Sequence, residues 1–445
     1  MTSIRRAAAA LAAMLMLLAP ALWNGFPLLQ YDTGGYLARW YEGTLEVSRS
    51  TVYGAFLDLL ARPDFWPAVV VQAALTVWIL LLVLRVHGFG EKARWLIIAV
   101  AGLSALTTLP WLASVLLTDI FAGLAVLALY LLALRAGALA RWERVALVAF
   151  VAFAAATHNA TLAVLLALLV AGLPVAVLRR NAVPLAGLAR GAGALVLGVA
   201  MLFAANFAVA GRLAWTPGGI PILFGRMLQV GIVARYLDDH CPDPRLKLCP
   251  HRAELPDDAD VFFWGEGVFD RLGRFEGLND EMRTIVLESL RQYPGLQLKA
   301  ALAGTLQQLL SVGTGYGVLQ NELWHSQAMI EKFVPRATAA MRAARQQQAG
   351  IDFTAINRVH VPVAYASMLL LLGIIALGVA RPRFADLGWL AATAALAILA
   401  NAFVCGAMSN PHDRYGARMV WLAPLVILLA GARARDPSGR PGRLL

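Results

Sequence analysis

Charged residues are scarce in this chain. Only 15% of its 445 residues are Asp, Glu, Lys or Arg, against roughly 25% in an ordinary soluble domain, and 60% are hydrophobic. This balance excludes a soluble globular protein and indicates a membrane protein. Lysine is the rarest of the charged types, and the excess of arginine over lysine suggests a bacterium with a GC-rich genome. The chain also lacks internal repeats and low-complexity linkers.

Ionisable residues are nearly absent from the interiors of the long apolar runs. Ion-coupled transporters and proton pumps use such residues near the middle of the bilayer, so their absence argues against a transporter. The net charge of +11 does not indicate nucleic-acid binding, because the basic residues are spread over short segments between apolar runs. Membrane lipids are therefore the expected surroundings, and no nucleic-acid partner is predicted.

The apolar runs predict about ten transmembrane helices, at roughly 20 residues per span. They cover residues 7–24, 65–86, 95–111, 117–135, 145–157, 160–178, 191–210, 360–380, 385–406 and 417–431. The first run follows Arg5 and Arg6, so a signal peptide and a membrane anchor are the alternatives, and its length favours the anchor. The predicted fold class is an all-α polytopic membrane protein with a mostly helical extracytoplasmic insertion.

Basic residues alternate between the loops in a way that predicts the topology. Arginine-rich segments lie at residues 5–6, 85–94, 135–144, 179–190, 381–383 and 433–443. By the positive-inside rule these segments, and both termini, are cytoplasmic in a multi-pass protein of the bacterial plasma (inner) membrane. The acidic residues provide a check, because all but Glu91, Glu143, Asp386 and Asp436 fall on the other side.

This topology divides the chain into three parts. Residues 1–210 form an N-terminal core of about seven helices with a first outside loop at 25–64, residues 211–358 form an extracytoplasmic region, and residues 359–445 form about three helices and a cytoplasmic tail.

Two helices are expected within the extracytoplasmic region. Asn279 is predicted to cap a helix from Asp280 to Tyr293, with Met282, Ile285, Val286 and Leu290 on one face. A second amphipathic stretch, 296–311, is expected to pack on the first or to lie at the membrane surface.

Two of the three cysteines, Cys241 and Cys249, lie close together in this polar region, with His240 and His251 beside them. In an oxidising compartment a disulfide is the simplest interpretation. A zinc site of two cysteines and two histidines is the alternative, and the absence of a CxxC spacing argues against it.

The remaining polar residues gather where the predicted helices open to the outside. Asp32 lies in YDTGGYL, where Gly34 and Gly35 permit a tight turn and a close approach of the backbone to a ligand. A carboxylate there is a candidate general base, and the alternative is a helix cap. Asp119 stands in an apolar stretch with only Thr118 as a polar neighbour, which makes it a second candidate, again with helix capping as the alternative.

The run HDRYGAR places Arg414 and Arg418 four residues apart, on one helix face, with His412 and Tyr415 beside them. Arginine side chains suit phosphate oxygens, and the alternative is that Arg and Tyr anchor the helix at headgroup level. His158 and Asn159 lie at another predicted outer turn. They could donate to a substrate or satisfy backbone carbonyls, and the sequence does not decide between these roles.

With these residues the chain resembles the GT-C class of membrane glycosyltransferases, which move a sugar from a polyprenyl-phosphate carrier to an acceptor outside the cytoplasm. The resemblance rests on Asp32 in the first outside loop, Asp119 at the next outer turn, and the pair Arg414-Tyr415 opening a late helix. The DE pair and the RYLLP motif of many members are absent, so no subfamily is implied.

The resemblance implies that Asp32 takes the proton of the acceptor hydroxyl and that Arg414 and Arg418 stabilise the departing lipid phosphate. His158 or Asp119 would then orient the sugar or, with Asp32, bind a divalent cation. Two other functions remain open. One is a non-catalytic membrane subunit that contacts envelope-assembly partners through residues 211–358, and the other is a lipid or polysaccharide translocator.

Overall fold

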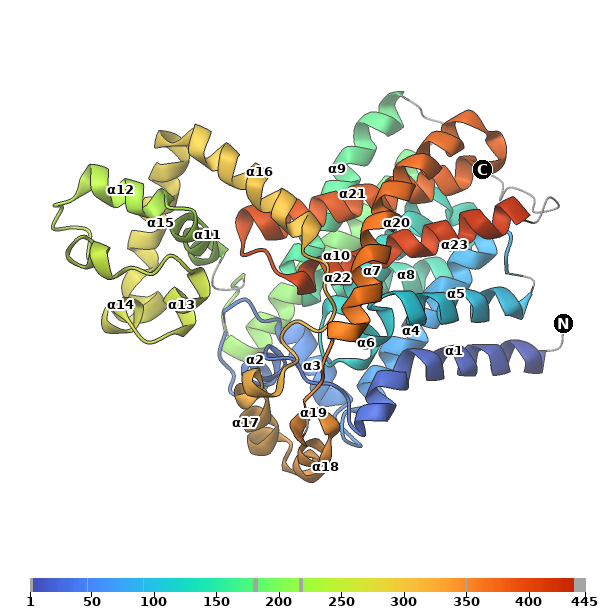
Figure 1. Ribbon diagram of the computed structural model, residues 1–445, viewed down its shortest axis with the longest axis horizontal. Coiled ribbons are helices and arrows are strands. Elements are labelled where there is room, and N and C mark those ends of the chain that lie inside the picture. The colour runs from blue at the N-terminus through green and yellow to red at the C-terminus, as the bar shows by residue number, and fades with distance from the viewer. Residues whose placement is uncertain are drawn as a thin grey trace.

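The described residues of the chain are mostly helical (Figure 1). The structure, a computed structural model, describes residues 3–45, 47–90, 92–178, 183–215, 219–348 and 350–435. Over these ranges no strand forms, and the only bridge of β type joins Leu28 to Val115. The all-α class is confirmed.

A bundle of apolar helices makes up most of the molecule, and its members are α1 (Ser3–Asn24), α4 (Trp66–Val86), α5 (Ala93–Leu106), α7 (Asp119–Leu134), α8 (Arg141–Thr157), α9 (Asn159–Leu178), α10 (Leu185–Ala210), α20 (Thr354–Ala380), α21 (Ala385–Met408), α22 (Asp413–Val420) and α23 (Leu422–Arg435). Within the described ranges, seven helices are long and apolar enough to cross a membrane when α22 and α23 count as one, and a bent pair in the polar region raises this number to at most eight. A polytopic membrane protein is therefore confirmed, and the count of ten spans is not. The shortfall is three helices, because α5, α7 and α8 are only 14, 16 and 17 residues long.

The bundle has two distinct ends. Figure 1 shows both chain termini on the side away from α12 and α15, and we call this side the terminal end. The turns that follow α4, α7 and α20 lie there, whereas the turns that follow α1, α8 and α21 lie at the opposite end, which we call the lobe end. Residues 436–445, most of the predicted cytoplasmic tail, are outside the described residues, as are Glu91 and residues 179–182.

Helix α7 is the centre of the bundle. Its residues 119–133 are all buried, which fits a helix that is apolar on every side and has neighbours all around it. Its first residue, Asp119, is therefore held at the lobe end of the bundle in the middle of the protein.

The region 211–358 divides into two parts. Helices α11 (Gly219–Gln229), α12 (Ile232–His240), α13 (Ala259–Trp264), α14 (Val268–Arg271) and α15 (Arg274–Gln292) enclose an apolar core of their own, which we call the lobe. The later helices α17 (Trp324–Phe333) and α18 (Thr338–Ala343) contribute instead to the core of the bundle, where α17 packs against α2 (Thr33–Tyr41). The short helix α19 (Arg345–Gln348) contacts α1.

Helix α16 (Pro294–Leu310) connects the lobe to the bundle (Figure 1). It packs along the lobe-end part of α21, and the absence of a side chain at Gly304 and Gly406 lets the two backbones touch. The leucines on the other face of α16 are exposed, among them Leu298, Leu302 and Leu306.

The predicted start of the helix at 280–293, which corresponds to α15, is wrong. Helix α15 begins six residues earlier, at Arg274 after Gly273 in a left-handed conformation, so Asn279 lies inside the helix and does not cap it. Glycine at this position provides the helix start that the sequence pattern assigned to asparagine. Met282, Ile285 and Val286 are buried in the lobe as a face, but Leu290 is exposed.

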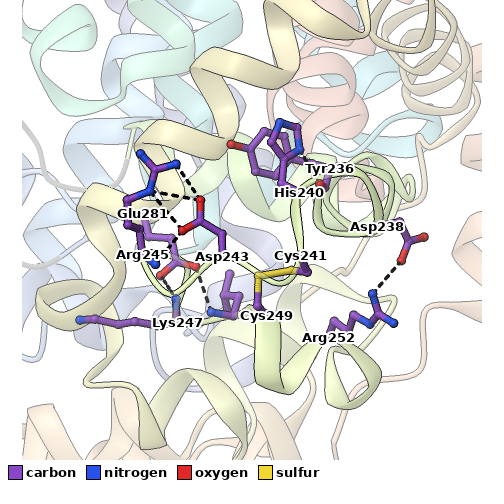
Figure 2. The surroundings of a disulfide bond; sticks show 11 residues. Tyr236, Asp238, His240, Cys241, Asp243, Arg245, Lys247, Cys249, Arg252 and Glu281 are labelled. Atoms are coloured by element: carbon purple, nitrogen blue, oxygen red, sulfur yellow. Dashed lines mark hydrogen bonds and ion pairs between the residues drawn. A yellow bond between two sulfur atoms is a disulfide. The ribbon is translucent and has the colours of Figure 1, made fainter.

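Cys241 and Cys249 form a disulfide that closes the loop after α12, with a Cα–Cα distance of 5.6 Å (Figure 2). The neighbouring histidines face other groups. His240 lies against the ring and the carbonyl of Tyr236, and His251 pairs with Glu254. The zinc arrangement considered from the sequence is therefore not formed.

Candidate functional site

Two carboxylates from distant parts of the chain meet one arginine at the lobe end of the bundle. Arg414, on α22, donates from Nη1 to Asp32 Oδ2 at 2.5 Å and from Nε to Asp119 Oδ2 at 2.8 Å. Asp32 precedes α2, and Asp119 begins α7. The three residues are only 5% (Asp32), 1% (Asp119) and 6% (Arg414) exposed, so this is a buried ion-pair network.

Arg418, one helical turn after Arg414, extends the network into the bundle. Its Nη1 lies 3.4 Å from Asp119 Oδ1 and 3.3 Å from His158 Nδ1. Its Nη2 donates to Asn401 Oδ1 at 2.7 Å. The Arg418 guanidinium can only donate hydrogen bonds, so His158 Nδ1 must be the acceptor, and the imidazole ring must be neutral.

A third arginine, Arg49, pairs with the remaining oxygen of Asp32. It reaches Asp32 because Gly35 has no side chain: a Cβ at that position would lie 2.8 Å from Arg49 Nε. The neighbouring Gly34 packs directly on the backbone of α17, where its N–H donates to Ser326 Oγ at 2.8 Å. The sequence predicted that these glycines allow a ligand to approach the backbone. In the structure the space beside them is filled by the Arg49 side chain and by the backbone of α17.

The capping alternatives have no support in the hydrogen bonds. Neither Asp32, which precedes α2, nor Thr118, which precedes α7, makes a side-chain cap bond, and both acids face arginines. Arg414 and Arg418 are buried, so they do not act as headgroup anchors. Charge pairing, and not helix capping or anchoring, accounts for these side chains.

The electrostatic balance of the network leaves one positive charge. Three guanidinium groups, those of Arg49, Arg414 and Arg418, face two carboxylates, which gives a net charge of +1. Burial acts to raise the pKa of Asp32, but Arg49 and Arg414 outweigh it and hold that pKa below its ordinary value. Burial and the nearby arginines lower the pKa of His158 well below its ordinary value, so it stays neutral.

A small cavity of about 40 Å³ lies beside the network, lined by Asp119, Arg414 and Gln30 among others. A water molecule takes about 30 Å³, so this space is far too small for a sugar. The side-chain Nε2 of Gln30 is buried there without an acceptor. A loop covers the site: Gly313 N–H donates to Asp413 at 2.9 Å, and Gly317 accepts a bond from Tyr31 N–H at 3.0 Å.

The structure brings together five of the predicted site residues, namely Asp32, Asp119, His158, Arg414 and Arg418. The other predicted residues lie at the edge of this network or outside it. The Tyr415 ring lies against both arginines, 5.3 Å from Arg414 and 5.2 Å from Arg418.

The other predicted residues lie outside the network. His412 is half-buried, with its ring 4.7 Å from that of Tyr316 and its Nε2 3.5 Å from Asp260 of the lobe. Asn159 is exposed at the start of α9. The disulfide of Cys241 belongs to the lobe.

Sequence reasoning missed Arg49, Gln30 and Asn401. Arg49 carries a detectable signal, because an arginine in a loop predicted to be outside departs from the positive-inside pattern. Asn401 is a polar residue inside an apolar run, and such residues need a partner in a membrane. Gln30 has no signal in sequence.

The carboxylates of the network are not arranged to bind a metal ion. Asp32 and Asp119 face the Arg414 guanidinium, and over the described ranges no three His, Cys, Asp or Glu side chains are grouped to hold a metal ion. The comparisons with known proteins add no assignment, because no protein-family model, curated protein or solved structure matches the chain.

Proposed function

We propose that the protein is a membrane glycosyltransferase that moves a sugar from a polyprenyl-phosphate donor to an acceptor on the extracytoplasmic side. One observation carries the proposal: Arg414 meets Asp32 and Asp119, which lie hundreds of residues before it in the chain, in one buried network. With Arg49 and Arg418 this network has an excess positive charge. Transfer of a sugar from a phosphate leaving group needs a base for the acceptor hydroxyl and cations that stabilise the departing phosphate, and a carboxylate beside several arginines supplies both.

In the proposed reaction the acceptor hydroxyl attacks the anomeric carbon and its proton passes to Asp32. The bond between the anomeric carbon and the phosphate oxygen breaks, and the electron pair leaves with the polyprenyl phosphate. Arg414 and Arg418 stabilise this developing anion, which is the largest expected contribution to the rate. In this proposal the neutral ring of His158 and the unpartnered Nε2 of Gln30 hydrogen-bond sugar hydroxyls.

The paired network is, in this proposal, the resting state of the enzyme. Arg414 is engaged by two carboxylates, and the cavity is too small for a sugar, so donor binding must open the ion pairs. When the donor phosphate takes over Arg414, Asp32 loses a cation that lowers its pKa. The pKa of Asp32 then rises, and the carboxylate becomes a better base.

Sugar transfer from a polyprenyl-phosphate donor in proteoliposomes, measured beside donor binding, tests the proposal. Asp32→Asn should abolish transfer and retain donor binding, because it removes the base and frees two arginines. Arg414→Ala should weaken donor binding and slow transfer, and Arg414→Lys should restore the charge without the two-pronged geometry, giving partial rescue. The matched controls are Asp58→Asn and Arg336→Ala, which change exposed residues outside the network.

Full transfer by Asp32→Asn would refute the base assignment. A second candidate, a non-catalytic membrane subunit of an envelope polysaccharide assembly system, would then take first place. One observation favours it, namely that the carboxylates of the network are already paired and the cavity beside them is small. Co-purification of assembly partners that bind the lobe, without any transfer activity, would support it.

The membrane sides belong to the same proposal. We propose a bacterial inner-membrane protein with the site and the lobe outside and both termini in the cytoplasm, which the arginine-rich loops support. A phosphatase fused at Gly267, in the lobe, should be active, and one fused at Leu445 should be inactive. The reverse result would contradict the orientation.

A further inference from the structure

A second buried polar cluster lies at the terminal end of the bundle, away from the site described above. Arg433 of α23 pairs with both oxygens of Asp386 of α21, at 3.1 Å each. Asp386 Oδ2 is 2.9 Å from His87 Nδ1, just after α4, and the hydroxyl of Tyr130 on α7 lies 3.1 Å from His87 Nε2. Four helices of the bundle are thus joined by side chains that never reach water.

Arg135, which ends α7, is only partly satisfied in this cluster. Its Nε donates to the Tyr130 hydroxyl at 3.1 Å, but Nη1 and Nη2 are both buried without a hydrogen-bond partner. The residue is 3% exposed. The other described carboxylate at this end, that of Glu143, is taken by Arg85 and by the start of α8. A buried guanidinium with two free nitrogens is costly, and it points to an acceptor that the described residues do not provide.

The charges of the cluster lead to the same conclusion. Arg135 and Arg433 carry two positive charges, and Asp386 carries one negative charge, which leaves +1. Burial lowers the pKa of His87 despite the neighbouring Asp386, so the imidazole ring is neutral and does not change the charge of the cluster. Within this buried cluster, one positive charge is left without a partner of opposite sign.

An apolar groove begins at the same place. It has a volume of about 190 Å³ and lies between α7, α9, α10 and α21, lined by side chains that include Tyr130, Leu188 and Trp389. Ala133 and Leu134, which directly precede Arg135, also line it. An apolar cavity of about 150 Å³ is enough to hold a benzene molecule, so this groove has room for a stretch of hydrocarbon chain.

We propose that Arg135 and this groove bind an anionic phospholipid from the leaflet at the terminal end. The lipid phosphate accepts hydrogen bonds from Nη1 and Nη2 of Arg135, for which the planar guanidinium is suited. One acyl chain occupies the groove beside Tyr130. Other arginines at this end, such as Arg94 and Arg381, add a general attraction for anionic lipid. The bound lipid joins the ends of α7 and α21 and supplies the missing charge.

The test measures lipid binding to the delipidated full-length protein in detergent. Native mass spectrometry gives the number of bound phosphatidylglycerol or phosphatidylcholine molecules with matched chains, and thermal unfolding gives the lipid-dependent rise in melting temperature. Phosphatidylglycerol should bind the wild type about tenfold more tightly than phosphatidylcholine. Both lipids carry the phosphate, but the choline ammonium of phosphatidylcholine cancels its charge, so only phosphatidylglycerol brings a net negative charge to the cluster. Arg135→Gln should remove this preference and the rise in melting temperature. Arg141→Gln, which changes an exposed arginine of the same end, should keep both.

Two further measurements separate a lipid from a free phosphate. Ala392→Phe fills the groove from α21 and should weaken phosphatidylglycerol binding, while millimolar inorganic phosphate should neither raise the melting temperature nor compete. If phosphate alone reproduces the rise and Ala392→Phe has no effect, the ligand is a free anion and the lipid proposal is wrong. Equal phosphatidylglycerol binding by Arg135→Gln and Arg141→Gln would also overturn it. Should Arg135→Gln not fold, Ala392→Phe tests the site through its apolar part.

Discussion

The interaction of Asp119 with Arg414 should be measurable as a coupling energy in the unfolding of the protein. Arg414→Gln removes the central cation and leaves Asp119 with only Arg418, at 3.4 Å, while Asp32 keeps Arg49. Breaking a buried ion pair by removing one partner costs about 3–5 kcal/mol, and we expect the lower end because each carboxylate retains one arginine. Asp119→Asn should cost less, because Arg414 keeps Asp32 and Arg418 keeps Asn401.

The double variant should therefore be less destabilised than the sum of the single variants. We expect a coupling of about 1–3 kcal/mol, as is typical of residues that share one buried network. The free energy of unfolding can be followed by tryptophan fluorescence in mixed micelles with an increasing fraction of denaturing detergent. Glu42 with Lys332, an exposed pair, is the control and should give about 0–1 kcal/mol. Effects of Asp119→Asn and Arg414→Gln that add to within about 0.5 kcal/mol would refute the paired network.

Three other predictions follow from the described contacts. Gly35→Ala should displace Arg49 from Asp32, because the new methyl group takes the place of the arginine side chain. The pH profile of transfer should then change, and an unaltered pH profile would count against the contact. Because the pKa of Asp32 is lowered in the folded protein, its contribution to stability is complete above its pKa in the unfolded chain, about 4, and is lost as the pH falls through its pKa in the folded protein. Asp32→Asn should therefore flatten the acid limb of the plot of unfolding free energy against pH, and an unchanged limb would contradict this. Cys241→Ser should destabilise the lobe by about 2–3 kcal/mol, which is the loop-closure contribution for so short a loop. Peptide mapping of the wild type without reductant should recover Cys241 linked to Cys249, and two free thiols would rule the bond out.

Much of the fold could be predicted because apolar length is a local property. Runs such as 65–86 and 385–406 correspond closely to α4 and α21, since about twenty apolar residues form a helix whatever their neighbours are. The errors occur where length is ambiguous or where backbone conformation decides. Helix α5 ends at Leu106, five residues before the predicted end, because the chain turns at Thr107 and Thr108 before α6 (Leu109–Ser114). Helix α15 starts at a left-handed glycine that carries no strong sequence signal.

The division of residues 211–358 was beyond the reach of the sequence. Helices α15 and α17 are both amphipathic, but the first closes the lobe and the second packs on α2, and only their partners distinguish them. A helix that buries one face does not specify which surface it meets.

For the candidate site, the sequence by itself determined the chemistry of the side chains and the end of the bundle where they lie. Asp32, Asp119 and Arg414 each stand at the boundary of an apolar run, and alternating helices bring such boundaries to the same end. Only the tertiary structure decided that one guanidinium lies between both carboxylates, that Arg49 takes the free oxygen of Asp32, and that Asn159 stays outside. The physical reason is range: a hydropathy pattern places a residue along the membrane normal, whereas an ion pair depends on the lateral packing of helices, which is set by contacts between residues far apart in the chain.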